Sequence, residues 1–84
     1  MNIRLNKRVV YRVIDGEALI FSIDKRIFFL LNESATYVFD LIARNFKKDS
    51  IIKKYSTKFR CSLEESEKDI GLLLDNLNKN KIIA

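Results

Sequence analysis

The pattern of hydrophobic and polar residues changes near residue 32 from the period of a strand to the period of a helix. Residues 9–14 are mostly β-branched or aromatic, and apolar residues dominate 17–24, so both segments predict strands. Asp15-Gly16 lies between them and is typical of a two-residue hairpin, because a type I′ turn needs positive φ at both central positions. In the second strand we expect two faces, formed by Ala18, Ile20 and Ser22 and by Leu19, Phe21 and Ile23.

The longest apolar run consists of Ile27, Phe28, Phe29, Leu30 and Leu31, and it stops at Asn32. Its lack of helical spacing predicts a third strand over 27–31 that is apolar on both faces. Asn32 is a suitable N-cap, because its side-chain oxygen can accept a free N–H from the first turn of a helix. A strand of this kind is either buried within a sheet or is an edge that awaits a partner.

Two helices are expected directly after this strand. The first spans 33–46, and its buried stripe is formed by Ala35, Val38, Phe39, Ile42 and Phe46. Tyr37 and Leu41 fall outside the stripe, so we expect them to be partly exposed. The second spans 50–59 and can be capped by Asp49 or Ser50. Its apolar face is formed by Ile51, Ile52, Tyr55 and Phe59.

A third helix is predicted over 63–79, because Ser62-Leu63-Glu64-Glu65 is a capping box. Its core stripe is formed by Leu63, Ser66, Ile70, Leu73, Leu74 and Leu77. At about 100° per residue, Leu72 projects away from this stripe, alongside Asp69 and Asn76. We expect the apolar tail 81–84 to lie back on the core.

Three strands in an antiparallel meander followed by three helices predict an α+β, winged helix-turn-helix-like arrangement in one domain over 1–84. Such arrangements are common in DNA-binding proteins, so a winged-helix DNA-binding protein is the alternative function. Charge argues against it. The predicted third helix has five acidic residues against two basic ones, so a helix in the recognition position would meet phosphates with the wrong sign.

The composition limits the chemistry that the chain can perform. Cys61 is the only cysteine among 84 residues and there is no histidine, which excludes an internal disulfide, an ordinary Cys/His zinc site and a Cys–His nucleophilic pair. We therefore expect no catalytic residue, no metal and no cofactor. No apolar segment is long enough to span a membrane, and the N-terminus lacks the apolar core of a signal peptide, so we expect a cytoplasmic protein. The net charge of +5, concentrated in 47–60, suggests an acidic partner.

The order of three segments resembles the PqqD family. These are 12–18, then 27–35 with its aromatic strand ending in Leu31-Asn32, and finally Asp69-Ile70 and Leu77 before Ile82-Ile83. More broadly, the chain resembles the PqqD-like recognition elements of ribosomally made, post-translationally modified peptides. The likeness runs from about Val9 to Ile83.

The resemblance implies a non-catalytic peptide chaperone. Such a domain binds the leader segment of a precursor peptide and presents it to a modifying enzyme, often a radical SAM protein or a leader peptidase. In the family the leader adds as a strand beside the third strand and fills the groove toward the third helix. The corresponding peptide-binding residues here are Ile27, Phe28, Phe29, Leu30, Leu31, Asp69, Leu72, Leu73 and Asn76.

The residues alone agree that 27–31 is an edge, because the third strand of a meander has one free side and this one lacks the Lys, Pro or bulge that protects edges. Two alternatives are compatible with the same pattern. A helix or the C-terminal tail can cover the edge, or two copies can pair through it as a homodimer. A short precursor peptide and a maturase encoded beside the gene would favour peptide binding.

Overall fold

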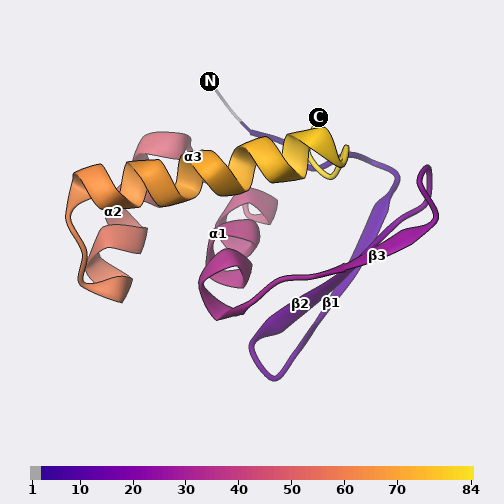
Figure 1. The fold of residues 1–84 in the computed structure, drawn as a ribbon, viewed down its shortest axis with the longest axis horizontal. Coiled ribbons are helices and arrows are strands. Elements are labelled where there is room, and N and C mark those ends of the chain that lie inside the picture. The colour runs from indigo at the N-terminus through magenta and orange to yellow at the C-terminus, as the bar shows by residue number, and fades with distance from the viewer. Residues whose placement is uncertain (1–2) are drawn as a thin grey trace.

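The structure, a computed structural model, describes residues 3–84 and contains in that range a three-stranded sheet followed by three helices (Figure 1). The strands are β1 (Val9–Ile14), β2 (Glu17–Ser22) and β3 (Ile27–Leu30). The helices are α1 (Glu33–Ala43), α2 (Lys48–Phe59) and α3 (Leu63–Lys79). The predicted α+β arrangement, a meander followed by three helices, is therefore confirmed.

The sheet is an antiparallel meander in the order β1-β2-β3. Asp15 and Gly16 both have positive φ, 51° and 79°, as the predicted hairpin turn requires. Ile20 in the central strand pairs with Tyr11 of β1 and Phe29 of β3, so these three side chains share the face that meets the helices. The opposite face of the sheet carries exposed apolar side chains, including Val10, Ile14, Phe28 and Leu30.

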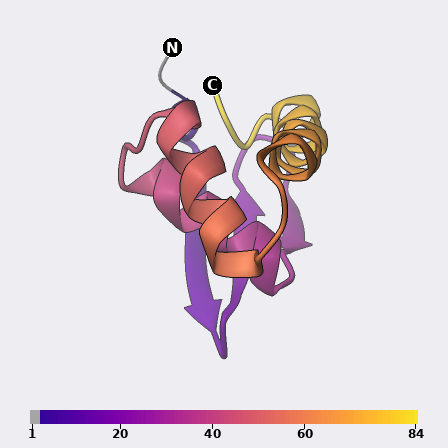
Figure 2. The same cartoon turned by 90° about the vertical axis from the view of Figure 1, so that its left-hand side faces the viewer.

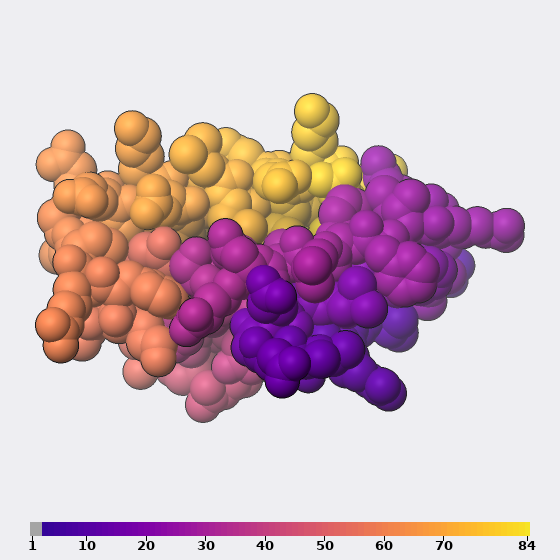
Figure 3. All heavy atoms as spheres, turned by 60° about the horizontal axis from the view of Figure 1, so that its bottom comes forward, coloured from indigo at the N-terminus to yellow at the C-terminus, as the bar shows by residue number. Residues whose placement is uncertain are grey.

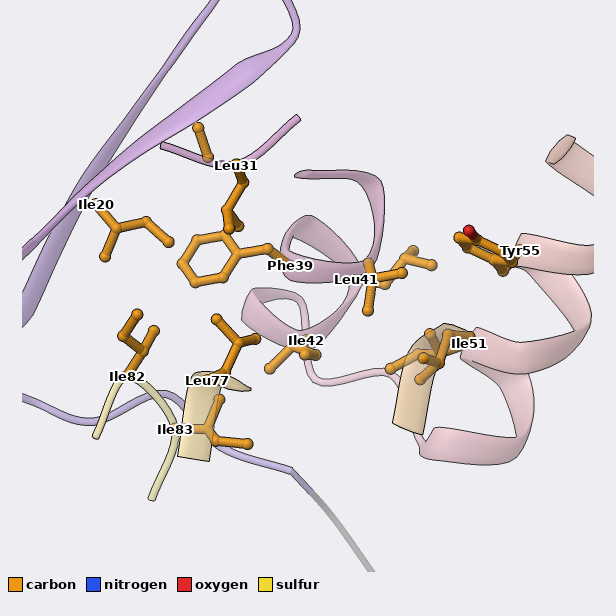
Figure 4. Close-up of a cluster of buried hydrophobic side chains, with 13 residues drawn as sticks. Ile20, Leu31, Phe39, Leu41, Ile42, Ile51, Tyr55, Leu77, Ile82 and Ile83 are labelled. Atoms are coloured by element: carbon orange, nitrogen blue, oxygen red, sulfur yellow. The ribbon is translucent and has the colours of Figure 1, made fainter. Parts of the chain in front are cut away.

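The core lies between this sheet face and the helices (Figure 4). Ala18, Ile20 and Ser22 form the buried face of β2, and Phe39 of α1 packs edge-on against Tyr11 with ring centroids 4.8 Å apart. α1 contacts β2 on one side and α2 on the other, and α3 packs along α2. Figures 1 and 2 show α1 between the sheet and α2, with α3 crossing above both.

Two predictions about burial were wrong. Leu41 is only 3% exposed, because α2 covers the flank of α1 that the helical wheel left free, and Figure 4 shows Leu41 between Phe39 and Tyr55. Leu63, placed on the core stripe, is 55% exposed. It is the first residue of α3, at the end of that helix farthest from the sheet (Figure 1).

Several element boundaries also differ from the predicted ones. α1 ends at Ala43, three residues early, because the chain turns through Asn45 with a φ of 65°. α2 begins at Lys48, and its N-cap Lys47 makes no side-chain capping bond, so the expected cap at Asp49 or Ser50 was wrong. β2 and β3 end at Ser22 and Leu30, before the predicted 24 and 31. α3 has the bounds expected, with the Ser62 side chain accepting from the Glu65 N–H.

The C-terminal tail lies on the core as expected, with Ile82 and Ile83 buried. It pairs with the N-terminal segment: the Asn6 N–H donates to the Ile82 carbonyl at 2.9 Å, and Leu5 forms a bridge with Ile83. This pairing uses the backbone of the tail, so the tail does not occupy the edge of β3. Within the described residues, every helix is too short or too polar to cross a membrane.

Candidate functional site

The side of β3 that faces away from β2 is an open sheet edge. In the described part of the chain, β2 is the only strand that pairs with β3. The Leu31 N–H donates to the Ala18 carbonyl of the β2 side at 2.9 Å. Because backbone groups along a strand point alternately to its two sides, the N–H and C=O groups of Leu30 and Phe28 point to the open side. These groups are available to a further strand.

The side chains of the predicted binding segment 27–31 fall into two groups. Phe28 and Leu30 are 66% and 67% exposed and lie on the outer face of the sheet. Phe29 is half-buried and Leu31 is buried, so these two side chains hold β3 against the core. Ile27, which pairs with Ser22, is exposed at the start of the strand. A ligand can therefore contact this segment mainly through its backbone and through two outer side chains.

A pocket lies where the chain leaves β3 and enters α1. Its volume is about 260 Å³, and α1, α2 and α3 all contribute to its wall. We call it the α3 pocket; it is lined by Asn32, Ser34, Ala35, Val38, Tyr55, Asp69, Ile70, Leu72 and Leu73. Figure 3 shows the orange and yellow atoms of α3 above the magenta atoms of the β3–α1 segment on this face of the molecule.

The structure brings together part of the predicted set. Asp69, Leu72 and Leu73 line the α3 pocket, whereas Asn76 and the residues of 27–31 are outside its lining. Leu72 is 63% exposed, in agreement with its predicted position off the core stripe. The open edge and the α3 pocket are consecutive along the chain, because β3 ends at Leu30 and the pocket begins at Asn32.

Six lining residues were not among the predicted site residues: Asn32, Ser34, Ala35, Val38, Tyr55 and Ile70. The sequence does contain a local signal for Asn32, because this residue is recognisable as the N-cap of α1, and the cap positions the chain at this end of the pocket. Its Oδ1 accepts from the Ala35 N–H at 2.9 Å and from the Ser34 hydroxyl at 3.2 Å. Tyr55 carries no such signal, because its place in the pocket depends on how α2 packs against α3.

The polar part of the α3 pocket contains one charged group. The Tyr55 hydroxyl donates a long hydrogen bond of 3.4 Å to Oδ2 of Asp69. Burial, and then the negative charge of Asp69, raise the pKa of the Tyr55 hydroxyl above its usual value of 10.0. Tyr55 is therefore a neutral donor at physiological pH. Among the residues that the structure describes, no group of three or more His, Cys, Asp and Glu side chains is arranged to hold a metal ion.

The chain is similar to known proteins both in sequence and in fold. Residues 17–83 match the family model described as Coenzyme PQQ synthesis protein D (PqqD). No curated protein matches the chain. One similar solved structure is "TbiB1 in Complex with the TbiA(beta) Leader Peptide", with a TM-score of 0.92 and 16% identity over 95% of this chain and 93% of that one.

A second similar structure is "Lasso peptide synthetase B1 complexed with the leader peptide", with a TM-score of 0.91 and 14% identity over 100% of this chain and 99% of that one. Identities at this level show a shared fold. The family match covers most of the chain and reaches from β2 through α3 to the buried tail. The resemblance noted in the sequence is thereby confirmed, and the chain belongs to the PqqD family.

Proposed function

We propose that this protein binds the leader segment of a ribosomally synthesised precursor peptide by strand addition at β3, next to α3, and presents it to a modifying enzyme. The observation that carries the proposal is the open edge of β3, which leads directly into the α3 pocket. Both similar structures are complexes in which a protein of the same fold is bound to a leader peptide. Membership of the PqqD family supports the same function.

The binding free energy would come from two sources, the backbone of β3 and the α3 pocket. Phe28 and Leu30 offer roughly four backbone hydrogen bonds to an added strand, each contributing about 0.5–1.5 kcal/mol net. Ordering a flexible peptide costs several kcal/mol, so these bonds alone do not give tight binding. The exposed apolar side chain of Leu72 and the rest of the α3 pocket would then supply the remaining affinity and the selectivity.

The protein itself would be non-catalytic. Its sequence has no histidine and one cysteine, so it lacks the groups that most often act as general base or activated nucleophile. Chemistry would be supplied by a separate enzyme, a radical SAM maturase or a leader peptidase, to which the bound leader is delivered. Because the substrate is made by the ribosome, we place this function in the cytoplasm.

An N-methyl scan of the peptide tests the binding mode without altering the protein. Where a short precursor peptide is encoded beside the gene, its N-terminal half is the probe, labelled with fluorescein and titrated by anisotropy. Strand addition predicts that N-methylation weakens binding at every second residue over the paired segment, because only alternate N–H groups face β3. Uniform sensitivity, or none, would contradict the proposed mode.

A matched pair of protein variants tests strand addition by altering the protein instead of the peptide. Leu30→Pro removes an N–H that points to the open side and so leaves the pairing with β2 intact, whereas Leu30→Thr keeps the N–H. We expect the proline variant to bind the peptide at least about tenfold more weakly than the threonine variant, with similar circular dichroism. Equal binding by the two variants would place the peptide elsewhere.

The same edge could instead pair with a second copy of the chain, as in a homodimer. Analytical ultracentrifugation distinguishes the two occupants. Self-pairing through β3 predicts dimers that Leu30→Pro and added peptide both dissociate. A dimer that persists in both cases would use a different surface and leave the edge free for the leader.

A further inference from the structure

The α3 pocket combines apolar walls with a single charged end. Ala35, Val38, Leu72 and Leu73 supply the apolar part, and the polar part comes from Asn32, Ser34, Tyr55 and Asp69. Its volume of about 260 Å³ is several times the ~30 Å³ that one water molecule takes in the liquid, so it has room for one long side chain. This combination suits a side chain with an apolar stem and a polar tip.

Asp69 is the only charged residue among those lining the pocket. Within residues 3–84 it forms no salt bridge, although Lys68 is its neighbour in the sequence. The Tyr55 hydroxyl donates to Oδ2 of Asp69, which leaves Oδ1 free to accept from a ligand. Tyr55 and Asp69 come from different helices, and their contact places the carboxylate, which stays exposed to solvent, beside the apolar wall.

One further carboxylate lies on the same side of α3 as Asp69. On α3, Glu65 lies one turn before Asp69 and on the same side of the helix, whereas Glu64, Glu67 and Lys68 project to other sides. The neighbouring helix α2 instead carries Lys48, Lys53, Lys54 and Lys58 against Asp49. The charged residue that lines the α3 pocket, Asp69, is therefore opposite in sign to the net charge of the chain.

We propose that the α3 pocket binds one lysine or arginine side chain of the leader, whose stem packs on Leu72 and Leu73 and whose cation pairs with the Asp69 carboxylate. This inference rests on the proposed function, because the side chain belongs to a peptide added at β3. It goes further by assigning a chemical class to one leader position. A neutral apolar residue at that position would partly desolvate the carboxylate and leave its Oδ1 without a donor, which disfavours it.

The test is a selection that does not require the natural leader. A display library of random 16-residue peptides is selected in parallel on the wild type, on Asp69→Asn and on Glu67→Gln. Glu67→Gln removes the same charge from the same helix, at an exposed residue outside the pocket lining. Binding of the recovered peptides to Leu30→Pro is then compared with their binding to the wild type, to establish that they use the edge of β3.

The expected result is enrichment of Lys or Arg at one fixed distance from the edge-binding segment. The enrichment should persist with Glu67→Gln and disappear with Asp69→Asn. A single peptide carrying that residue should bind Asp69→Asn about tenfold more weakly than the wild type, the loss expected for one charge-assisted hydrogen bond. Asp69→Lys should reverse the preference and select Asp or Glu at the same position.

Two results would overturn the inference, and only the first of them would be compatible with strand addition at β3. Peptides that need the edge of β3 but show no cationic position, or show it equally with Asp69→Asn, would refute the cation site and retain strand addition. Recovered peptides that bind Leu30→Pro as well as the wild type would refute strand addition, and the cation site with it.

Discussion

Leu72 and Leu63 are exposed leucines of the same helix, and of the two Leu72 lines the α3 pocket. Full burial of a leucine side chain is worth about 1.5–3 kcal/mol, so a leader that covers half of Leu72 gains roughly a factor of ten in affinity. Leu72→Asn should therefore weaken binding of the leader probe about tenfold in an anisotropy titration. Its free energy of unfolding should stay within about 0.5 kcal/mol of the wild type, as is usual for exposed positions.

Leu63→Asn is the matched control, because it makes the same change at an exposed position of α3 outside the pocket. It should bind the probe like the wild type. An equal loss of affinity in both variants would indicate a general effect on α3 and would argue against a contact between Leu72 and the leader.

The raised pKa of Tyr55 predicts that the stability of the domain is sensitive to alkaline pH. Its raised pKa means that the folded protein keeps a proton that the unfolded chain has already lost. This contribution to stability is complete below the unfolded-state pKa of about 10 and is lost as the pH rises through the folded-state pKa. As the pH rises above about 10, the melting temperature of the wild type should fall more steeply than that of Tyr55→Phe. Parallel curves would show that Tyr55 does not contribute.

At the scale of elements, Thr36 joins α1 to the sheet. Its buried hydroxyl accepts from the Ala18 N–H at 2.8 Å and donates to the Leu31 carbonyl at 3.2 Å. The start of β2, the end of β3 and the first turn of α1 thus meet at one side chain. This contact sets the direction in which the chain leaves β3, and with it the position of the open edge relative to the α3 pocket.

Thr36→Val keeps the shape of the side chain and leaves a buried N–H and a buried carbonyl without this partner. An unsatisfied buried polar group costs about 1–3 kcal/mol, so urea unfolding should show a loss of at least that size. Thr57→Val is the control, because its hydroxyl bonds to the Lys53 carbonyl on the exposed face of α2. That variant should lose less than about 0.5 kcal/mol. Equal losses would argue against a special role for Thr36.

At the scale of the whole molecule, charge is divided between neighbouring helices. α2 is strongly basic, whereas α3 has five acidic residues against two basic ones. A winged-helix protein that reads DNA inserts a recognition helix into the major groove, where an acidic helix is repelled by phosphates. The fold alone therefore does not indicate DNA binding in this chain, and the charge of α3 disfavours it.

Duplex DNA should accordingly bind weakly and without sequence preference. In a gel-shift series with a random-sequence duplex, we expect binding only at low salt, through the lysines of α2. Lys53→Glu combined with Lys54→Glu should then abolish it. A sequence-specific dissociation constant of about 10 nM at physiological salt, found by selection from a duplex pool, would contradict this prediction.

The amino-acid sequence determined the type and order of the elements in this protein, because the signals that set them are local. Asp15-Gly16 supplies the two positive φ angles of a hairpin, and Asn32 and Ser62 each supply a capping oxygen for the helix that follows. Each of these interactions joins residues at most three apart, so it can be recognised without knowing the fold.

Tertiary structure decided which surfaces are covered and which side chains meet. Leu41 is buried because α2 packs on a flank of α1 that its own helical period leaves free. Tyr55 and Asp69 come together only because α2 and α3 pack side by side, and no spacing in the sequence encodes their contact. A helical wheel describes one helix alone, whereas a pocket is a property of the space between several, so the α3 pocket could be located only after the helices had been placed.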